Sequence, residues 1–424
     1  MRGFTDEQGR PHAASRSVPM PDSPTATRRP DLRLILLLGA LAACGPISID
    51  MYLPSLPSLA AAFDISVSAA QVTLTSFMFG FSIGMLLYGP LSDAYGRRPI
   101  LIGGIVLYVL ASIACALATS IGGLIAARFL QALGAGAALV LARTIARDAH
   151  GPADAARVLS MLAIVTSIGP LLAPLVGGQL LLLGGWRAVF VTLTLFGTAC
   201  AVMALRRIPE TWPTHKRHEN ALAASFAVYG RLLTDPVAWG YMLCGGMAFA
   251  GMFAYITATP FVYIDYFHVS AQAYGLFFAL NIVGIVAGNF LNMRLVGALG
   301  ALRMISVSSR VCLIASLSVF VACVTGWGGL RLIVVTLFFV VSVVGVLGAN
   351  CTTDLMHRYP RNAGAAAAVF GAMQLALGAL SSLAVGALQD GSPRAMGIVI
   401  GGCGIAAYVG YRLVARSHRQ PVSA

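Results

Sequence analysis

The chain has 424 residues, of which 58% are hydrophobic and only 10% are charged, and its mean hydropathy is +0.83. Such a composition leaves too little polar surface to cover a water-soluble globule, so we expect an all-α membrane protein that crosses the bilayer many times. The formal net charge of +13 follows from the placement of the loops, described below, and we expect no nucleic-acid partner.

Residues 1–32 contain Pro, Ser, Thr and Arg but no apolar core. We therefore expect a disordered cytoplasmic tail there, neither a signal peptide nor a spanning helix. Each apolar stretch that follows has the length needed to cross a bilayer, roughly 20 residues. These stretches predict twelve spanning helices, near residues 34–56, 69–92, 100–118, 122–146, 156–182, 187–207, 237–259, 272–296, 302–325, 330–355, 361–388 and 393–414.

The longest polar interruption separates two halves of six predicted helices each. The domains predicted from it are an N-terminal six-helix bundle over 33–207, a cytoplasmic linker over 208–235, a C-terminal six-helix bundle over 236–416 and a cytoplasmic tail over 417–424. A weak echo of the segment 89–98 occurs at 288–303 without its acidic residue, which suggests an internal duplication. We expect two pseudo-symmetric bundles that rock around a central cavity.

The segment that joins the second and third predicted helices concentrates charge at one membrane surface. Asp93 ends one apolar run, and Arg97 and Arg98 precede the next. Arginines beside helix ends tend to stay in the cytoplasm, and Asp93 can pair with an arginine or with the positive end of a neighbouring helix. We predict a gate that holds one face of the bundle shut; the alternative is a loop whose arginines only fix the orientation. The predicted gate residues are Gly89, Asp93, Gly96, Arg97 and Arg98.

Basic residues elsewhere are distributed unevenly between the two sides of the predicted membrane. If the N-terminus is cytoplasmic, the outside loops hold only Arg187, Arg331 and Arg394, and the other loop and tail arginines lie inside. This asymmetry obeys the positive-inside rule. We therefore place both termini in the cytoplasm of a multi-pass protein of the bacterial inner membrane.

Several segments carry a specific family resemblance. They are Ile47 to Pro54 in the first predicted helix, Gly89 to Arg98, Arg128 to Gln131 with Gly134, Gly169 to Gly178, Gly251 to Ile264, and Phe278 to Asn281. On these residues the chain resembles the drug/proton antiporters of the major facilitator superfamily, and within them the bicyclomycin-resistance and chloramphenicol-efflux group. The resemblance spans all twelve predicted helices. It implies a proton-coupled secondary antiporter that exports drugs or drug-like small molecules from the cytoplasm by alternating access.

Asp50 is the only acidic residue well inside a predicted helix. A carboxylate in hydrocarbon is costly and rare, so we predict that Asp50 binds and releases the transported proton; the alternative is that it caps a backbone break near Pro46 or Pro54. Arg128 lies at a similar predicted depth, about 9 Å below the outer surface by helix rise. We expect it to pair with ionised Asp50, the alternative being an arginine that snorkels to the outer headgroups.

The fifth predicted helix carries a pattern that resembles the antiporter motif, with Ala173 where many relatives have glycine. We expect its prolines to kink the helix and its glycines to let a neighbouring helix approach closely, which seals one side of the cavity against proton leak. Ordinary small-residue packing is the alternative. The motif residues are Gly169, Pro170, Pro174, Gly177 and Gly178.

Substrate contacts are predicted from aromatic and amide side chains on the helices that line the cavity in this superfamily. Many relatives carry a second membrane carboxylate where this chain has Ala42, so we expect neutral, zwitterionic or amphiphilic substrates rather than cations. Arg310 is left out of the site because it lies near the cytoplasmic end of its helix and can snorkel. The candidates are Tyr52, Phe253, Tyr255, Phe261, Tyr263, Phe277, Asn281, Asn350, Phe370 and Gln374.

The sequence carries no pattern for catalysis or a metal site. The seven histidines lie mainly in tails and loops, and the eight cysteines fall in predicted helices without a CxxC pair. We therefore predict no enzymatic activity, cofactor or metal, and a monomer whose partners are a small-molecule substrate, protons and the lipid bilayer. The alternative function is export of a specific metabolite such as an amino acid or a siderophore. A nutrient symporter of the same fold and a membrane sensor without transport also stay open.

Overall fold

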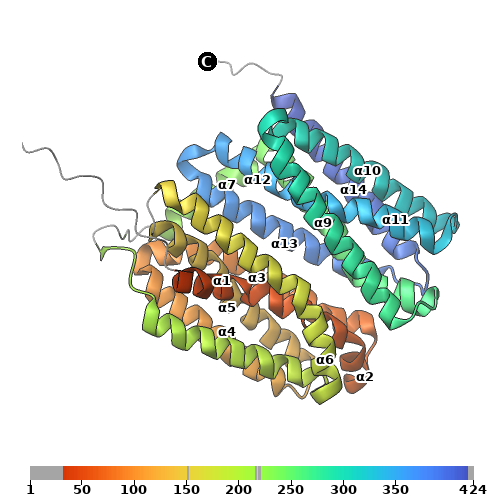
Figure 1. Cartoon of the computed structure of the whole chain (residues 1–424), viewed down its shortest axis with the longest axis horizontal. Coiled ribbons are helices and arrows are strands. Elements are labelled where there is room, and N and C mark those ends of the chain that lie inside the picture. Colours follow the sequence, from red (N-terminus) through yellow and green to blue (C-terminus); the bar gives the residue numbers. More distant parts are fainter. Residues whose placement is uncertain (1–31, 150–151, 215–216, 218–220, 419–424) are drawn as a thin grey trace, which may run out of the picture.

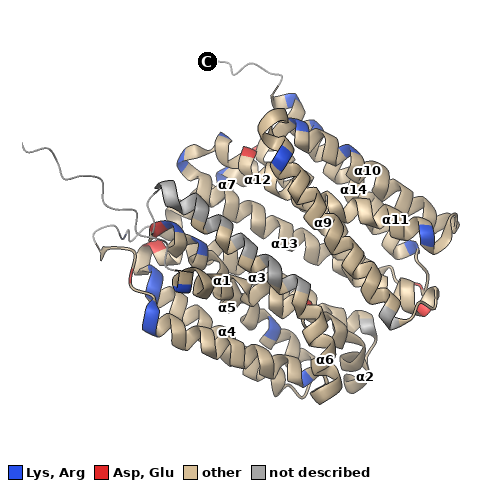
Figure 2. Ribbon diagram, in the orientation of Figure 1, with Lys and Arg blue, Asp and Glu red and all other residues tan. Residues whose placement is uncertain are grey.

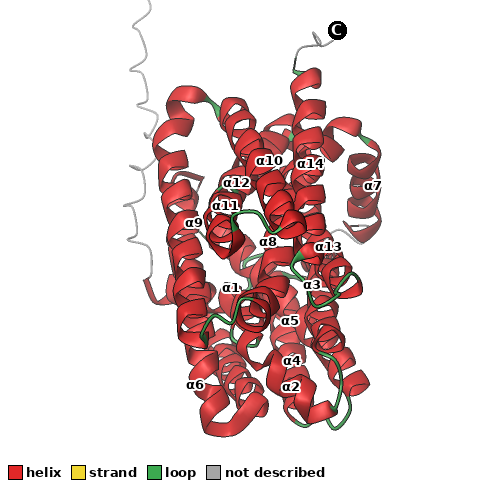
Figure 3. Ribbon diagram, turned by 90° about the vertical axis from the view of Figure 1, so that its right-hand side faces the viewer, coloured by secondary structure: helices red, strands yellow, loops and turns green. Residues whose placement is uncertain are grey.

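The computed structural model describes residues 32–149, 152–214, 217 and 221–418. Within these ranges all regular secondary structure is helical (Figure 3). Eleven helical stretches of the described chain are long and apolar enough to cross a membrane. Of the predicted tails at 1–32 and 417–424, residues 1–31 and 419–424 lie outside the described residues, and Leu32, Ser417 and His418 lie at the ends of the described helices.

The N-terminal half packs as one bundle of helices (Figure 1). Its elements are α1 Leu32–Asp50, the short 3₁₀ turn η1 Leu53–Ser55, α2 Leu56–Phe63, α3 Val67–Tyr95, α4 Arg97–Ala116, α5 Ile121–Asp148 and α6 Pro152–Arg207. The first predicted span therefore comprises α1, η1 and α2, because the regular helix ends at Asp50.

Two predicted spans, 156–182 and 187–207, lie within α6. A straight helix of its 56 residues would be about 84 Å long, far more than the roughly 30 Å of a hydrocarbon core. The backbone instead leaves the helical region at Gly184 and Gly185, where φ is −153° and +67°. In Figure 1 the yellow and yellow-green parts of α6 accordingly run in opposite directions. With this turn the twelve predicted spans all have helical counterparts.

The C-terminal half forms the second bundle. Its elements are α8 Pro236–Pro260, the π-helical turn η3 Phe261–Tyr266, α9 Ala271–Leu299, α10 Ala301–Thr325, α11 Gly329–Ser342, α12 Val344–Arg358, the 3₁₀ turn η4 Pro360–Asn362, α13 Ala363–Ala387 and α14 Arg394–Ser417. The tenth predicted span, 330–355, is divided between α11 and α12. The boundaries otherwise agree with the predicted stretches to within several residues.

Signals that can be read in the sequence start and stop several of these helices. The hydroxyls of Ser66, Ser120 and Ser270 accept hydrogen bonds from backbone N–H groups three residues later, at 3.2 to 3.3 Å, which satisfies donors that a helix start leaves open. Gly96 and Gly300 follow α3 and α9 with φ of +103° and +81°, values that favour glycine. The weak echo in the sequence thus corresponds to similar turns in the two halves.

The two halves meet along α3 and α13. The hydroxyl of Ser82 donates to the carbonyl of Ala372 at 2.8 Å, and the amide of Gln71 donates to a backbone carbonyl of α8 at 3.2 Å. The end of the Met85 side chain lies 2.6 Å from where a Cβ at Gly371 would sit. Because residues of α8 and α13 belong to the same apolar cluster as α1, α3 and α5, the halves share buried surface on this side.

A helix inside the predicted linker was not expected from the sequence. It is α7 Ala221–Thr234, and its Tyr229 hydroxyl donates to the carbonyl of Leu86 on α3 at 3.1 Å. Burial, with a smaller effect of Asp93, raises the pKa of Tyr229 to about 12, so the phenol stays a donor at neutral pH. The linker is therefore docked on the N-terminal half as well as joined to it.

Charged residues gather at one end of the bundle (Figure 2). We call it the basic end and define it by Arg97 and Arg98 at the start of α4, Arg206 and Arg207 at the end of α6, and Arg416 in the last turn of α14. Both ends of the described chain lie there, because α1 runs away from the basic end and α14 returns to it.

We expect a methyl group at Gly410 of α14 to destabilise the protein. A Cβ there would lie 2.5 Å from the backbone nitrogen of Cys244 and 2.7 Å from the carbonyl oxygen of Gly240, both on α8. Since backbone atoms cannot rotate away, α8 and α14 must separate, and overpacking of this kind costs about 1–3 kcal/mol. The melting temperature of Gly410→Ala in detergent is expected to fall, whereas Gly402→Ala, which adds its methyl in open space on the same helix, serves as the control. Equal melting temperatures would contradict the close contact.

Candidate functional site

The candidate site is built around the point where α1 stops. The amide of Tyr52 donates to the carbonyl of Ile49 at 3.2 Å instead of to that of Ser48, and Pro54 has no N–H to offer the carbonyl of Asp50. The chain continues through η1 into α2 within one apolar stretch of 32 residues. The break therefore leaves the Ser48 carbonyl free for another helix and places Asp50 at the end of the regular helix.

Arg128 of α5 uses that carbonyl. Its side chain is completely buried, its Nη2 donates to the Ser48 oxygen at 3.2 Å, and its Nη1 donates to Oε1 of Gln131 at 2.6 Å. The guanidinium carbon lies 4.6 Å and 4.2 Å from the ring centres of Tyr52 and Phe77. Carbonyl oxygens and aromatic faces offset part of the cost of removing a guanidinium from water. Because its side chain is completely buried, Arg128 does not reach the outer headgroups, and the snorkelling alternative is excluded.

The predicted ion pair between Asp50 and Arg128 is wrong for this structure. Among the described residues, no carboxylate oxygen of Asp50 lies within 4.0 Å of an arginine nitrogen, because the guanidinium is turned towards Ser48 and Gln131. The Asp50 side chain also makes no hydrogen bond within the described chain, so it does not cap the break. A half-buried carboxyl group inside a membrane span is thus left without a partner.

Further polar groups hold the Arg128 environment in place. The Nε2 of Gln131 donates to the hydroxyl of Ser112 at 2.8 Å, and the hydroxyls of Ser48 and Tyr108 are 2.8 Å apart. Sequence reasoning included Ser48 and Gln131 only in the segments that carry the family resemblance, and it missed Tyr108, Ser112 and Phe77. The one available signal was the spacing of Gln131, three residues after Arg128 and so on the same helix face; the partners from α3 and α4 have no such signal.

The glycines of α6 pack against α1 on both sides of Asp50. A Cβ at Gly177 would collide with the carbonyl oxygen of Met51, and one at Gly169 would lie 3.1 Å from the side chain of Ile47. The close approach expected from the motif is therefore present, and its neighbour is α1.

Gly178 does not make this contact. A Cβ at Gly178 would meet no atom within 4 Å. The backbone of α6 stays helical through Pro170 and Pro174 and leaves the helical region only at Gly184 and Gly185. The side chain of Pro170 lies outside the described part of the structure.

An apolar groove runs beside the contact of α1 with α6. Its volume is 310 Å³, and it reaches Met51, the residue after Asp50. The residues that line it are Ala40, Ala43 and Ile47 of α1, Met51 directly after α1, and Val165, Gly169, Leu172, Ala173, Val176 and Phe196 of α6. Such a surface accommodates uncharged or amphiphilic molecules and offers no anionic group to a cation.

The predicted gate residues are centred on Arg97. Its guanidinium is 3% exposed, and it pairs with Asp93 at 2.5 Å and with Asp148 at 3.1 Å. The Nη1 of Arg97 also donates to the hydroxyl of Ser92 at 2.6 Å, and the guanidinium carbon of Arg97 lies 4.5 Å from the ring centre of Trp212. One arginine thereby ties the ends of α3 and α5 and the linker together.

Glu210 completes the gate from the linker. Its carboxylate accepts the backbone N–H groups of Arg97 and Arg98 at 2.9 and 3.3 Å, where the start of α4 favours a negative charge. Gly96 is required here, since a Cβ would lie 2.5 Å from this carboxylate and φ is +103°. Arg98 itself is exposed, and a Cβ at Gly89 would meet no atom within 4 Å. The gate residues that sequence reasoning missed are Asp148, Glu210 and Trp212.

Four of the predicted substrate residues form a polar aromatic cluster on α8, η3 and α9. The amide nitrogen of Asn281 donates to the hydroxyl of Tyr255 at 2.8 Å, and the rings of Tyr263 and Phe277 are 5.6 Å apart. The Tyr263 hydroxyl and the Asn281 Oδ1 are buried without a hydrogen-bond partner in the described structure. The cluster therefore holds two buried polar atoms whose hydrogen-bonding capacity is not used within the described structure.

The other candidates are dispersed. Tyr52 belongs to the Arg128 environment, and Asn350 donates to Asn292 at 2.7 Å. Phe370 packs under Gly245, and Phe253 belongs to the apolar cluster shared with the N-terminal half. The remaining two are Phe261, half-buried in η3, and Gln374, whose amide donates to the Gly245 carbonyl at 3.5 Å. Within the described residues no group of three or more His, Cys, Asp or Glu side chains could hold a metal ion.

Comparison with known proteins agrees with this architecture. The family profile described as Major Facilitator Superfamily matches residues 38–382. A Bacillus subtilis (strain 168) protein named uncharacterized MFS-type transporter YdgK is 37% identical over 366 residues, which is 86% of this chain and 90% of that protein. A Haemophilus influenzae protein named bicyclomycin resistance protein homolog is 30% identical over 89% of this chain and 94% of its own length.

Two further comparisons concern resistance and fold. Multidrug resistance protein D of Escherichia coli (strain K12) is 28% identical over 86% of this chain and 91% of that protein. The crystal structure of a D-xylose-proton symporter superposes with a TM-score of 0.72 at 19% identity, covering 90% of this chain and 97% of the symporter. The symporter likeness establishes the fold.

Replacing the two adjacent gate arginines is expected to give different results. Arg97→Gln removes a buried charge from Asp93 and Asp148, whose side chains are 40% and 15% exposed. Solvent compensates much of the loss at Asp93, whereas leaving the more buried Asp148 unpaired costs about 1–3 kcal/mol. Arg98→Gln changes an exposed side chain and should stay within about 0.5 kcal/mol of the original protein. The measurement is thermal unfolding in detergent, and a larger loss for Arg98→Gln than for Arg97→Gln would refute this description of the gate.

The adjacent glycines of α6 offer a second matched pair. Gly177→Ala drives a methyl group into the Met51 carbonyl and should push α6 away from α1, at a cost of about 1–3 kcal/mol. Gly178→Ala adds its methyl in open space and is the control. We expect a lowered melting temperature only for Gly177→Ala; the reverse order would show that the helices are packed differently.

Proposed function

The chain belongs to the Major Facilitator Superfamily, and on that premise we propose that it is a proton-coupled antiporter that exports drugs or drug-like small molecules by alternating access. The observation that carries the proposal is Asp50, a carboxyl group without a partner in the described chain, inside a membrane span and beside the break in α1. Relatives named for bicyclomycin and multidrug resistance support the substrate class. The role is that of a transporter and not of an enzyme.

We further propose that the basic end faces the cytoplasm of a bacterial inner membrane, with both termini on that side. Arginines near helix ends are retained in the cytoplasm during insertion, and the gate around Arg97 lies at this end. The gate then closes the cytoplasmic face, and Asp50 lies nearer the outer face. The chain acts as a monomer on small molecules and protons and does not bind nucleic acid.

Protonation of Asp50 is the proposed coupling step. The Arg128 guanidinium donates to the carbonyl of Ser48, the residue two positions before Asp50. Its positive charge therefore favours the ionised form of Asp50 without a direct contact. A proton that enters from outside neutralises Asp50 and changes the charge at the break between α1 and α2. Because Gly177 of α6 packs on Met51, a shift at this break is transmitted to α6 and displaces substrate outward.

The groups available to substrate fit uncharged or amphiphilic molecules. The groove between α1 and α6 is apolar, and the unpartnered atoms of Tyr263 and Asn281 offer hydrogen bonds. Aromatic surface with a few polar groups accommodates molecules of different shapes. Apart from Asp50 there is no carboxylate in these surfaces to attract a cation.

The test is proton release from detergent-purified protein on addition of chloramphenicol, bicyclomycin, sulfonamides or cysteine. We expect release with at least one compound, its loss in Asp50→Asn, and its retention in Asp64→Asn. Asp64 is an exposed carboxylate with φ of +52°, a conformation that Asn tolerates, so this control removes a charge without strain.

Release that persists in Asp50→Asn would place the proton site elsewhere. Silence of the original protein towards chloramphenicol, bicyclomycin and sulfonamides, with proton release on addition of cysteine, another amino acid or a siderophore, would instead support export of a specific metabolite.

A further inference from the structure

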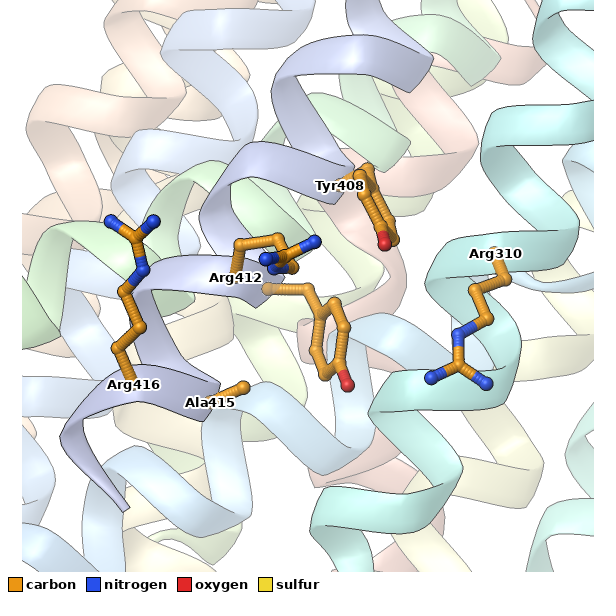
Figure 4. A pocket seen from close by; sticks show the side chains of 6 residues that line it. Arg310, Tyr408, Arg412, Ala415 and Arg416 are labelled. Carbon is orange, nitrogen blue, oxygen red and sulfur yellow. The ribbon is translucent and has the colours of Figure 1, made fainter. Parts of the chain in front are cut away.

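A polar cavity lies between α10 and α14, away from the site described above (Figure 4). Its volume is 280 Å³, and it is lined by Arg310 of α10 and by Tyr408, Tyr411, Arg412, Ala415 and Arg416 of α14. In Figure 4 the side chain of Arg310 extends from α10 towards α14, and Arg412 lies beside Tyr408. Sequence reasoning treated Arg310 as an isolated arginine and gave it no partner.

The three arginines of this cavity are not neutralised by the described protein. No ion pair there includes Arg310, Arg412 or Arg416. The acidic residue of the neighbouring α12 is Asp354, and it is engaged by the Tyr241 hydroxyl at 2.7 Å and faces His418 at 3.7 Å. Three positive charges around one polar cavity repel one another, so the cavity favours an anion.

The depth of these arginines points to the membrane as the source of that anion. Arg310 lies nine residues into α10 and Arg412 five residues before the end of α14, which corresponds to about 14 Å and about 8 Å from the helix ends. Exposed apolar side chains flank them on the same helices: Val307 and Ile314 on α10 and Ile405 and Val409 on α14. A charged cavity next to an apolar helix surface matches a headgroup followed by acyl chains.

Hydrogen-bond donors are available as well as charge. The Tyr411 hydroxyl accepts a hydrogen bond from Ser306 at 2.8 Å, which leaves its own O–H free to donate. The guanidinium carbon of Arg412 lies 6.0 Å from the Tyr408 ring centre, and both side chains line the cavity. Arginine forks bind phosphate oxygens in pairs, and basic pockets between membrane helices bind anionic headgroups.

We propose that this cavity binds the phosphate headgroup of an anionic phospholipid in the leaflet at the basic end. The arginines and Tyr411 hold the phosphate oxygens, and the acyl chains lie along the apolar surfaces of α10 and α14. A bound lipid would then join α10 to α14 at the basic end and stabilise the lipid-facing surface of the C-terminal half. The site is independent of Asp50 and of the transported substrate.

The experiment measures lipid-dependent stabilisation of the full-length purified protein. Phosphatidylglycerol is added to the protein in detergent, with phosphatidylcholine as the neutral lipid and inorganic phosphate as the free anion. We expect phosphatidylglycerol to raise the melting temperature more than the other two. In the double variant Arg310→Gln/Arg412→Gln the apparent affinity should fall by about tenfold or more.

Matched variants show whether a changed lipid response comes from the lost charge in the cavity, from impaired folding or from the loss of any surface arginine. Arg206→Gln removes an exposed arginine at the basic end of the other half and should keep the full response. Arg310→Lys keeps the charge but loses the planar fork, and it should retain more of the response than Arg310→Gln, which also shows that the position tolerates substitution. Each variant is first required to elute as a single species in size-exclusion chromatography, and the two single glutamine variants replace the double variant if it does not.

An unchanged lipid response in the glutamine variants would overturn the proposal. Equal stabilisation by phosphatidylcholine would do the same, because charge would then be irrelevant. Equal stabilisation by inorganic phosphate would reassign the cavity to a soluble phosphate and exclude the lipid.

Discussion

The N-terminal half depends on how it accommodates one fully buried guanidinium. Removing a charge from water is costly in any protein interior, and Arg128 has no carboxylate partner in the described structure. The Ser48 carbonyl, the Gln131 amide oxygen and the rings of Tyr52 and Phe77 take its place. The carbonyl is available only because α1 stops forming regular hydrogen bonds there. The break in α1 and the buried arginine therefore require each other.

This arrangement explains why Asp50 has no partner in the described chain. A direct pair with Arg128 would have stabilised ionised Asp50 and opposed its protonation. In the described structure neutral groups hold the guanidinium instead, and the proposed proton step breaks no ion pair between these two residues. The contact of Gly177 with Met51 joins α6 to this break in α1.

The two halves of the molecule are braced differently at the basic end. At the basic end, Arg97 binds two carboxylates, and Glu210 from the linker binds the start of α4, so the N-terminal half is braced by charge. The corresponding turn at Gly300 has no acidic residue. On that side Asp354 is used by Tyr241 and His418 instead. The halves touch along α3 and α13. In the proposed alternating access they rock around this contact, and the basic end can open only when the contacts of Arg97 break.

The sequence by itself determined the class, the number of spans and their approximate limits, and it selected Asp50, Arg128 and the gate segment as candidate functional residues. It could do so because hydrophobic length, charge asymmetry and rare buried charges are properties of single segments. Only the tertiary structure decided that Arg128 contacts Ser48 and not Asp50, that Asp148, Glu210 and Trp212 complete the gate, and that α7 lies within the linker. Those contacts join residues far apart in the chain, and the choice among several polar partners depends on which backbone groups a helix break leaves free. No spacing in one sequence records that choice.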